Sequence, residues 1–263
     1  MIPIRDQLPT RRVPVVTYAL IAANVLAFIW EAALVGVGYE RVVFDWGLVP
    51  ARFLQNPVIE LPTIFTSMFM HSPEGWWHLG GNMLFLWIFG DNVEDVLGRG
   101  RYLGFYLLSG IAAALAQIAI GPGSVAPMVG ASGAIAGVVA AYGSLYPRSP
   151  ILVINPILPL WLFMGPLFTL PAWVIIGEFF LMNLLSGVQS LGYAAAGGVA
   201  FFAHLGGFVA GLVLVRLMLP RPQREHDPWA GWQSPPRLPG PEASYDPRFP
   251  RHPGRYPGRS GRW

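Results

Sequence analysis

The sequence predicts an all-α polytopic membrane protein, organised as a bundle of six transmembrane helices. The first observation behind this class is composition: 54% of the 263 residues are hydrophobic and only 12% are charged. A soluble domain carries roughly 25% charged residues, so this chain has too few polar groups to cover a surface that faces water. The second observation is that the apolar residues come in blocks of about twenty, the length of a helix that crosses the lipid core.

Six apolar segments are predicted to form the helices, because polar, arginine-containing or Gly/Pro-rich stretches separate them. They are residues 14–37, 77–97, 102–120, 132–146, 170–186 and 199–219. Asn24 and Glu31 fall within the first helix, where polar side chains are expected to face protein or the membrane interface. Residues 38–76 form a long acidic connection whose tryptophans and tyrosine favour a position along that interface.

The fifth helix is the hardest element to place. Residues 149–187 form one apolar tract that five prolines interrupt, and proline breaks a helix interior because it lacks an N–H group. A single helix over 170–186 is expected, with 149–169 as an interfacial approach and 187–199 as a Gly/Ala-rich loop. The alternative is one additional crossing within 149–169.

The chain is thus divided into a cytoplasmic N-terminus (1–13), a membrane domain (14–219) and a tail (220–263). The tail is rich in Pro, Arg and Gly with few aliphatic residues, and this composition predicts disorder. All seventeen basic residues are arginine. Six helices put most of them on one side, so the positive-inside rule predicts that both termini are cytoplasmic. An additional crossing would export the tail, which counts against it.

A serine and a histidine within the apolar segments form the candidate catalytic pair. Ser132 opens the fourth helix in Gly130-Ala131-Ser132-Gly133, and His204 lies near the start of the sixth. A serine hydroxyl is a weak nucleophile and needs a base within hydrogen-bond reach. In the predicted topology both helices begin at the outer side of the membrane, so the two side chains lie at similar depths.

Glycines next to this pair predict how the two helices pack. Gly133 and Gly137 are four residues apart, as are Gly207 and Gly211. In an apolar helix this spacing makes a smooth strip on which two backbones can approach closely. Packing the two strips together would bring the hydroxyl and the imidazole within reach of each other.

His78 and Asn82 are predicted to assist the same reaction. They are four residues apart near the outer end of the second helix, so they face the same way. Both can donate hydrogen bonds to the oxyanion that forms when a carbonyl is attacked. Together with the backbone N–H of Ser132 they would support acyl transfer, with Ser132 as nucleophile and His204 as the base.

The pair is interpreted as a dyad rather than a triad. Glu31 and Glu178 lie in the membrane segments, but neither is placed to orient His204, and His71 is expected to brace the long connection. We expect no metal, because His78, Asn82 and His204 lack the spacing of a zinc-binding helix. The chain contains no cysteine for thiolate chemistry, and no cofactor or nucleic-acid partner is expected.

These residues resemble the motifs of the rhomboid family of intramembrane serine proteases. The resemblance rests on His78-x-x-x-Asn82, on Gly130-Ala131-Ser132-Gly133 and on Ala203-His204-x-x-Gly207-x-x-x-Gly211, each on the matching helix. It extends over residues 14–219. It implies a six-helix bundle with a water-filled cavity open to the outside, a Ser132–His204 dyad and cleavage of transmembrane protein substrates near their outer ends.

The resemblance also implies that the fifth helix and the loop at 187–199 form a mobile gate. One position departs from the pattern of some members, which carry an aromatic residue one turn after the nucleophile, where this chain has Ala136. The group that orients His204 is therefore left open. The exclusive use of arginine is typical of a GC-rich bacterial genome, which favours a bacterial inner membrane as the location.

Two other classes of function compete with the protease. A catalytically inactive relative that binds membrane proteins would be expected to lose the serine or the histidine, and this chain keeps both. A small transporter or channel would be expected to carry polar residues through the full membrane depth, whereas here they gather at one end.

Overall fold

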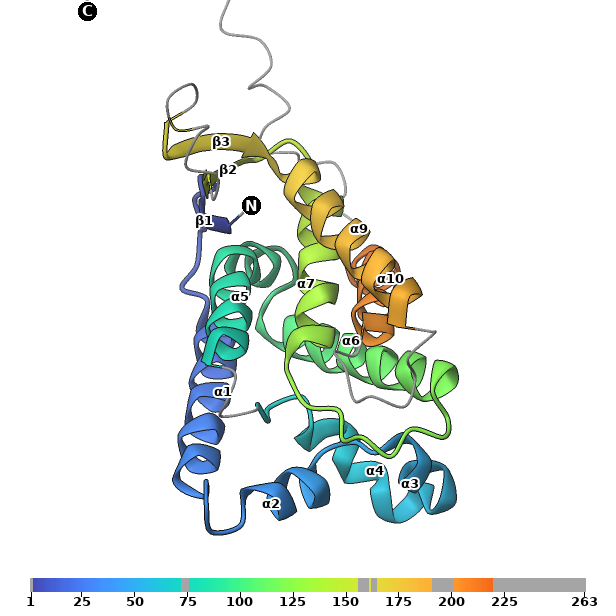
Figure 1. Ribbon diagram of the computed structural model, residues 1–263. Helices are drawn as coiled ribbons and strands as arrows, with labels where there is room; N and C mark the ends of the chain where they lie inside the picture. Colours follow the sequence, from blue (N-terminus) through green and yellow to red (C-terminus); the bar gives the residue numbers. More distant parts are fainter. Residues whose placement is uncertain (1, 72–75, 156–160, 162–164, 191–200, 220–263) are drawn as a thin grey trace, which may run out of the picture. The chain divides into compact units, whose positions relative to one another are not determined.

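The computed structural model describes residues 2–71, 76–155, 161, 165–190 and 201–219. In this part of the chain the fold is mainly helical, with one small sheet (Figure 1). The predicted tail, 220–263, and most of the predicted loop, 187–199, lie outside the described residues.

Six described helices occupy the six predicted segments. They are α1 (Val15–Ala33), α5 (Trp76–Leu97), α6 (Arg99–Ile120), α7 (Ser132–Leu145), α9 (Ala172–Ser190) and α10 (Phe201–Met218). The prediction placed the end of α9 too early, since the helix continues to Ser190. Gly187 lies within the helix, and a Cβ added to it would be 3.4 Å from the Cβ of Phe201 at the start of α10.

The membrane-spanning character of these helices follows from length and composition. Among the described helices, α1, α6, α9 and α10 each contain an apolar stretch of at least 18 residues. The apolar α7 has 14 residues, and α5 is long enough to span but carries acidic side chains in its last two turns. Asn24 and Glu31 of α1 are fully buried against protein, as predicted. The chain has a polytopic helical membrane fold.

Helix α7 lies at the centre of the bundle. It contacts α5, α6, α9 and α10, and every residue from Gly133 to Tyr142 is buried. Its sequence explains this position, because it consists mainly of Gly, Ala and Val, whose small side chains let neighbouring helices approach on all sides.

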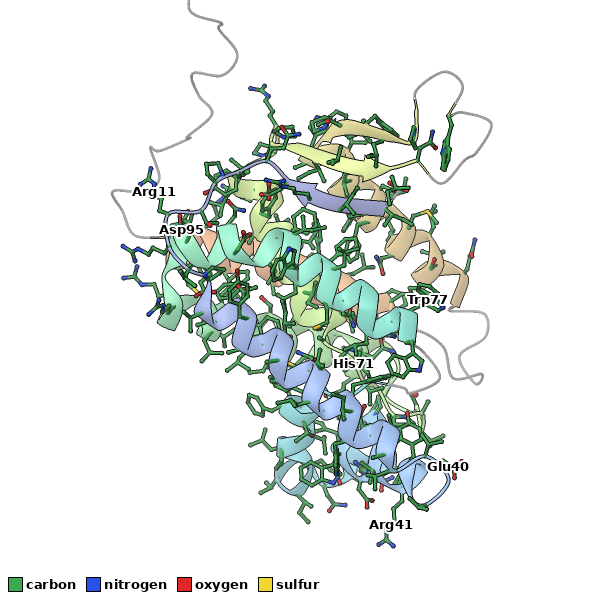
Figure 2. The ribbon with its side chains drawn as sticks, turned by 90° about the vertical axis from the view of Figure 1, so that its left-hand side faces the viewer. Arg11, Glu40, Arg41, His71, Trp77 and Asp95 are labelled. Carbon is green, nitrogen blue, oxygen red and sulfur yellow. The ribbon has the colours of Figure 1, made fainter. Side chains whose placement is uncertain are left out.

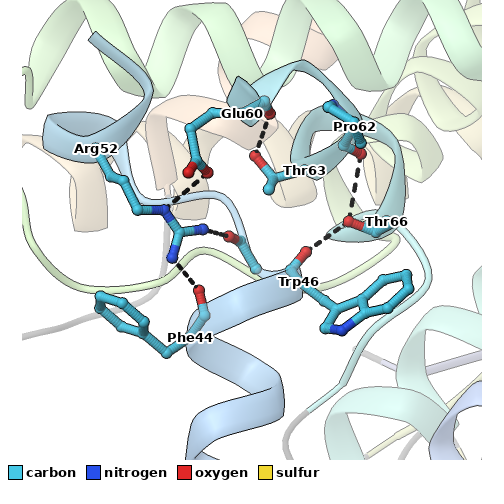
Figure 3. A network of polar contacts seen from close by, with 8 residues as sticks. Phe44, Trp46, Arg52, Glu60, Pro62, Thr63 and Thr66 are labelled. Carbon is cyan, nitrogen blue, oxygen red and sulfur yellow. Dashed lines mark hydrogen bonds and ion pairs between the residues drawn. The ribbon is translucent and has the colours of Figure 1, made fainter. Parts of the chain in front are cut away.

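The long connection after α1 folds into three short helices, α2 (Tyr39–Trp46), α3 (Pro50–Gln55) and α4 (Pro57–Thr66). Figure 3 shows the polar contacts that hold them together. The Arg52 guanidinium forms an ion pair with Glu60 at 2.7 Å and donates to the backbone oxygens of Phe44 and Gly47. The hydroxyl of Thr66 donates to the backbone oxygen of Trp46.

A three-stranded antiparallel sheet was not predicted from the sequence. Strands β2 (Pro150–Ile154) and β3 (Leu167–Pro171) form a hairpin, and β1 (Ile2–Asp6) pairs with the other edge of β2. In Figure 1 this sheet lies at one end of the helices and α2–α4 lie at the other. Because the hairpin pairs Pro150 with Pro171 and Ile154 with Leu167, the described ends of the segment lie side by side, an arrangement that differs from the additional crossing considered for 149–169.

The N-terminal segment is tied to the C-terminal end of α5. The Glu94 carboxylate accepts hydrogen bonds from the backbone N–H groups of Val16 and Thr17, at 3.0 and 2.8 Å, and from the Thr17 hydroxyl at 2.8 Å. Since the first N–H groups of a helix have no intrahelical acceptor, Glu94 caps α1 from another helix. Arg11 and Asp95 lie side by side nearby (Figure 2), where the Arg11 N–H donates to the carboxylate.

A buried carboxylate connects the sheet to the bundle. Asp6, at the end of β1, accepts hydrogen bonds from the Asn92 amide at 2.8 Å and from the Tyr142 hydroxyl at 2.9 Å. Burial raises the pKa of Asp6 to about 6, although the hydrogen bond from Tyr142 acts in the opposite direction.

Candidate active site

The structure brings Ser132 and His204 together. Ser132 is the first residue of α7, and His204 lies in the first turn of α10. Oγ of Ser132 is 2.6 Å from Nε2 of His204, a hydrogen-bond distance between residues 72 positions apart in the chain. His204 is buried, with 9% of its surface exposed, whereas Ser132 is half-buried.

The four glycines named from the sequence meet at the contact between α7 and α10. A Cβ on Gly207 would overlap the carbonyl oxygen of Gly133, and a Cβ on Gly211 would overlap the carbonyl oxygen of Gly137. The two glycines of α7 face α6 at the position where a Cβ would be. A Cβ on Gly133 would lie 2.6 Å from the Cβ of Ala113. Any larger side chain would separate the helices that carry Ser132 and His204.

His78 borders the same space as the serine hydroxyl. A Cβ built on Gly130 would lie 3.3 Å from Nε2 of His78 and 3.6 Å from Oγ of Ser132. Gly130 has φ +127°, a conformation that favours glycine, and its N–H donates to the backbone oxygen of Ser67 at 2.8 Å. This glycine therefore keeps the volume between the histidine and the serine open.

Asn82 is held by His71. One amide N–H of Asn82 faces Nε2 of His71 at 3.0 Å. The His71 ring is 1% exposed, and its pKa is lowered to about 4 by burial and by the nearby charge of His78. A neutral ring with Nδ1 facing the Phe69 carbonyl accepts through Nε2, which leaves the second amide N–H of Asn82 free of this contact.

His71 also fastens the long connection to α1, in the bracing role expected from the sequence. Its backbone N–H donates to Oε2 of Glu31 at 2.9 Å. In Figure 2 it lies in the interior beside α1, whereas Trp77, which is 93% exposed, projects from the start of α5. Glu31 therefore holds His71, whose ring in turn contacts Asn82, and Glu31 does not contact Ser132 or His204.

The sequence reasoning missed Asn183 of α9. Its Oδ1 lies 2.5 Å from Nδ1 of His204, on the side of the ring away from Ser132. The search for a third group considered carboxylates, and this partner is an amide. The available signal was an asparagine within an apolar helix, since a polar side chain in a membrane segment requires a partner.

The assembled groups are suited to nucleophilic acyl transfer. A serine hydroxyl lies within hydrogen-bond distance of one nitrogen of a histidine whose other nitrogen is engaged by Asn183, an arrangement suited to nucleophilic catalysis. The first N–H groups of α7, beginning at Ser132, have no acceptor within the helix and are therefore able to donate to a developing oxyanion. Within the described residues, no group of three or more His, Cys, Asp and Glu side chains is placed to hold a metal ion.

Comparison with known proteins identifies the family. Residues 59–221 match the Rhomboid domain. The chain is 32% identical over 145 residues to rhomboid protein 1, mitochondrial, of Saccharomyces cerevisiae, and 28% identical over 149 residues to the human presenilin-associated rhomboid-like protein, mitochondrial. It is also 32% identical over 128 residues to rhomboid protease GluP of Bacillus subtilis.

These matches cover about half of this chain, at 52%, 55% and 49%, and smaller shares of the relatives, at 38%, 36% and 24%. The chain therefore corresponds to one part of each relative. The Rhomboid domain itself covers more than half of the 263 residues and includes α5, α6, α7, α9 and α10. This protein belongs to the rhomboid family.

Proposed function

We propose that this chain is an intramembrane serine endopeptidase that hydrolyses peptide bonds in or near the transmembrane segments of other membrane proteins. The observation that carries the proposal is the 2.6 Å hydrogen bond between Oγ of Ser132 and Nε2 of His204. Its support is chemical, because a serine hydroxyl is a weak nucleophile until a base lies within hydrogen-bond reach. The relative from Bacillus subtilis named as a rhomboid protease adds to this support.

In the proposed reaction Oγ of Ser132 attacks a substrate carbonyl carbon while Nε2 of His204 takes the hydroxyl proton. The tetrahedral intermediate collapses when the C–N bond breaks, and the protonated His204 gives its proton to the departing amine. A water molecule then attacks the acyl-enzyme, with His204 again acting first as base and then as acid, which releases the new carboxyl terminus and restores Ser132.

The oxyanion of that intermediate is proposed to be held by three kinds of donor. These are the backbone N–H of Ser132, the side chain of His78 and the remaining amide N–H of Asn82. Each such donor in a water-excluded site is worth about 10²–10³-fold in kcat. The network from Glu31 through His71 to Asn82 would keep the amide in place before the substrate arrives.

The backbone hydrogen bonds of the substrate helix limit which segments can be cleaved. A transmembrane helix shields its carbonyl groups with intrahelical hydrogen bonds, so a segment must unwind before it can be attacked. We expect substrates with small residues and a helix breaker at the cut, because Gly and Pro weaken the helix there. Lipid and the transmembrane substrate are the partners that this reaction needs.

The orientation is part of the same proposal. The chain is an integral membrane protein, and its arginine distribution supports a topology with both termini in the cytoplasm and the site opening to the outer face. Two of the three relatives described above are mitochondrial and one is bacterial. The bacterial plasma membrane is therefore supported by the Bacillus subtilis relative and by the arginine usage, and not by the mitochondrial relatives.

The test is cleavage of a reporter transmembrane segment in liposomes by the wild type, by Ser132→Ala and by His204→Ala. The reporter carries small residues and a helix breaker at the intended cut. We expect site-specific cleavage by the wild type and a loss of at least about 10³-fold in each variant. The matched control is Ser144→Ala, because Ser144 lies on the same helix as Ser132 and contacts Arg216 instead of His204.

Cleavage that persisted in Ser132→Ala would refute the assignment of the nucleophile. No cleavage by folded wild type across a diverse reporter panel, together with stable capture of the reporters, would favour the inactive membrane-protein-binding scaffold.

A further inference from the structure

Both nitrogens of the His204 imidazole lie within hydrogen-bond distance of another side chain. Nε2 faces Oγ of Ser132 at 2.6 Å, and Nδ1 faces Oδ1 of Asn183 at 2.5 Å. Asn183 belongs to α9, so the nucleophile, the base and this amide come from three different helices.

The direction of the Asn183 amide is fixed by its own helix. Its Nδ2 donates to the backbone oxygen of Phe179, one turn earlier, at 2.8 Å. If the amide were turned around, its oxygen would face the Phe179 carbonyl, and two acceptors would oppose each other. Oδ1 therefore points to His204, and since this oxygen can only accept a hydrogen bond, the proton must be on Nδ1 of the ring.

This tautomer is the one that a base requires. With the proton on Nδ1, the lone pair of a neutral imidazole is on Nε2, which faces the serine hydroxyl. The opposite tautomer would direct an N–H at Ser132 and leave no lone pair there to receive its proton. The hydrogen bond to Asn183 selects between the two states.

Apolar neighbours hold the ring in place but do not make this selection. The ring of Phe179 has its centroid 6.3 Å from that of His204, and the ring of Phe201 is at 6.5 Å, nearly perpendicular. Ala136, one turn after Ser132 on α7, is not aromatic and carries only a methyl group. Phe179 and Asn183 are i and i+4 on one face of α9, so one helix supplies the neighbouring ring, the orienting carbonyl and the amide.

We propose that Asn183 is a positioning residue that holds His204 in the Nδ1–H tautomer with Nε2 directed at Ser132. The proposal deepens the proposed function and rests on it. The active arrangement is then a Ser132–His204–Asn183 unit in which the amide stabilises the ring, including the imidazolium that forms during the reaction, and never takes a proton.

The test compares Asn183→Leu, Asn183→Asp and the control Met182→Ala with the wild-type protein. Leucine is close to asparagine in size and removes the acceptor without opening a cavity, whereas aspartate keeps an acceptor. Met182 is adjacent on α9 and 56% exposed. Three quantities are measured: kcat and KM for the reporter, the rate of labelling of Ser132 by a fluorophosphonate, and the ¹⁵N spectrum of histidine-labelled protein, with His204 assigned from His204→Gln.

In Asn183→Leu we expect kcat and the labelling rate to fall together by about 10–100-fold, below the full contribution of a general base, with KM within about twofold. The His204 signals should change from a single Nδ1–H species to a mixture of tautomers. Asn183→Asp should recover most of the lost kcat, and Met182→Ala should behave as wild type.

A wild-type kcat and an unchanged ¹⁵N spectrum in Asn183→Leu would overturn the proposal, as would a rise in KM alone. The failure of the proposed function is distinguishable, because it would show as no cleavage and no labelling of Ser132 in the wild type. In that case the ¹⁵N spectrum still decides: a change of tautomer in Asn183→Leu supports the contact, and no change refutes it. If the leucine variant does not fold, Asn183→Ala is judged by the same spectrum: a mixture of tautomers supports the proposal, and a single Nδ1–H species refutes it.

Discussion

Adding one methyl group at Gly207 is expected to disconnect the dyad. In Gly207→Ala the new Cβ would overlap the carbonyl oxygen of Gly133, one residue from Ser132. Since Cβ atoms in real structures essentially never approach another heavy atom within 3.0 Å, α7 and α10 would have to separate by about 1 Å in a close-packed interior. Neither partner can rotate away, because the clash involves backbone.

The magnitude follows from the geometry of the dyad. His204 lies one turn before Gly207, so a separation of about 1 Å would stretch the 2.6 Å contact between Oγ and Nε2 beyond hydrogen-bond reach. A misplacement of this size costs about 10²-fold in rate. Overpacking of the helix contact should also lower the free energy of unfolding by about 1–3 kcal/mol.

The assay measures kcat for the reporter and thermal unfolding in the same detergent. The matched control is Gly104→Ala in α6, where the added Cβ would meet only Met218 at 3.8 Å, so activity should stay at the wild-type level. A Gly207→Ala protein with wild-type kcat and unchanged unfolding would refute the reasoning that backbone contact between α7 and α10 sets the position of the dyad.

Two further predictions concern the attachment of the N-terminal segment. Replacing Glu94 by Gln weakens the cap on Val16 and Thr17 and should cost about 1–2 kcal/mol of unfolding free energy. Asp95 accepts a hydrogen bond from the exposed backbone N–H of Arg11, so Asp95→Asn should lower the free energy of unfolding by less in the same denaturation experiment. Equal losses in the two variants would contradict the capping role of Glu94. The pKa of Asp6 is raised from 3.8 to about 6, so its protonated form favours the folded state. Stability should fall by up to about 3 kcal/mol as pH rises from about 4 to about 7. Asp6→Asn should flatten this dependence in unfolding curves measured at pH 4 and pH 7, and an unchanged slope would show that another group is responsible.

The extent of the helices could be read from the sequence because lipid imposes a local rule. A segment that crosses the hydrocarbon core must satisfy its own backbone groups, so apolar length and flanking polar residues are sufficient to locate α1, α6 and α10. The glycine spacing in α7 and α10 carried similar information, because a strip of small residues specifies a close approach whatever the partner. Ser132 and His204 stood out for the same reason, as polar groups in an apolar setting.

The contacts between distant segments depended on the tertiary structure. The pairing of β1 with β2 joins residues near the N-terminus to residues near position 150. Two strands of five residues each show too little alternation of polar and apolar side chains to predict this pairing. The cap on α1 comes from Glu94, 77 residues beyond Thr17, and no local pattern links them.

In the candidate site, too, some features could be predicted from the sequence and others depended on the tertiary structure. The sequence by itself determined the chemical types, a serine, a histidine, an amide and small residues, because burying polar groups in a membrane restricts which residues can occur. Only the tertiary structure decided which of these groups contact each other. Glu31 accepts a hydrogen bond from His71 and not from His204, Asn82 is hydrogen-bonded to His71, and Asn183 faces Nδ1 of His204. The physical reason is that a hydrogen bond depends on ångström-scale placement and direction, which helix packing sets and residue order alone does not.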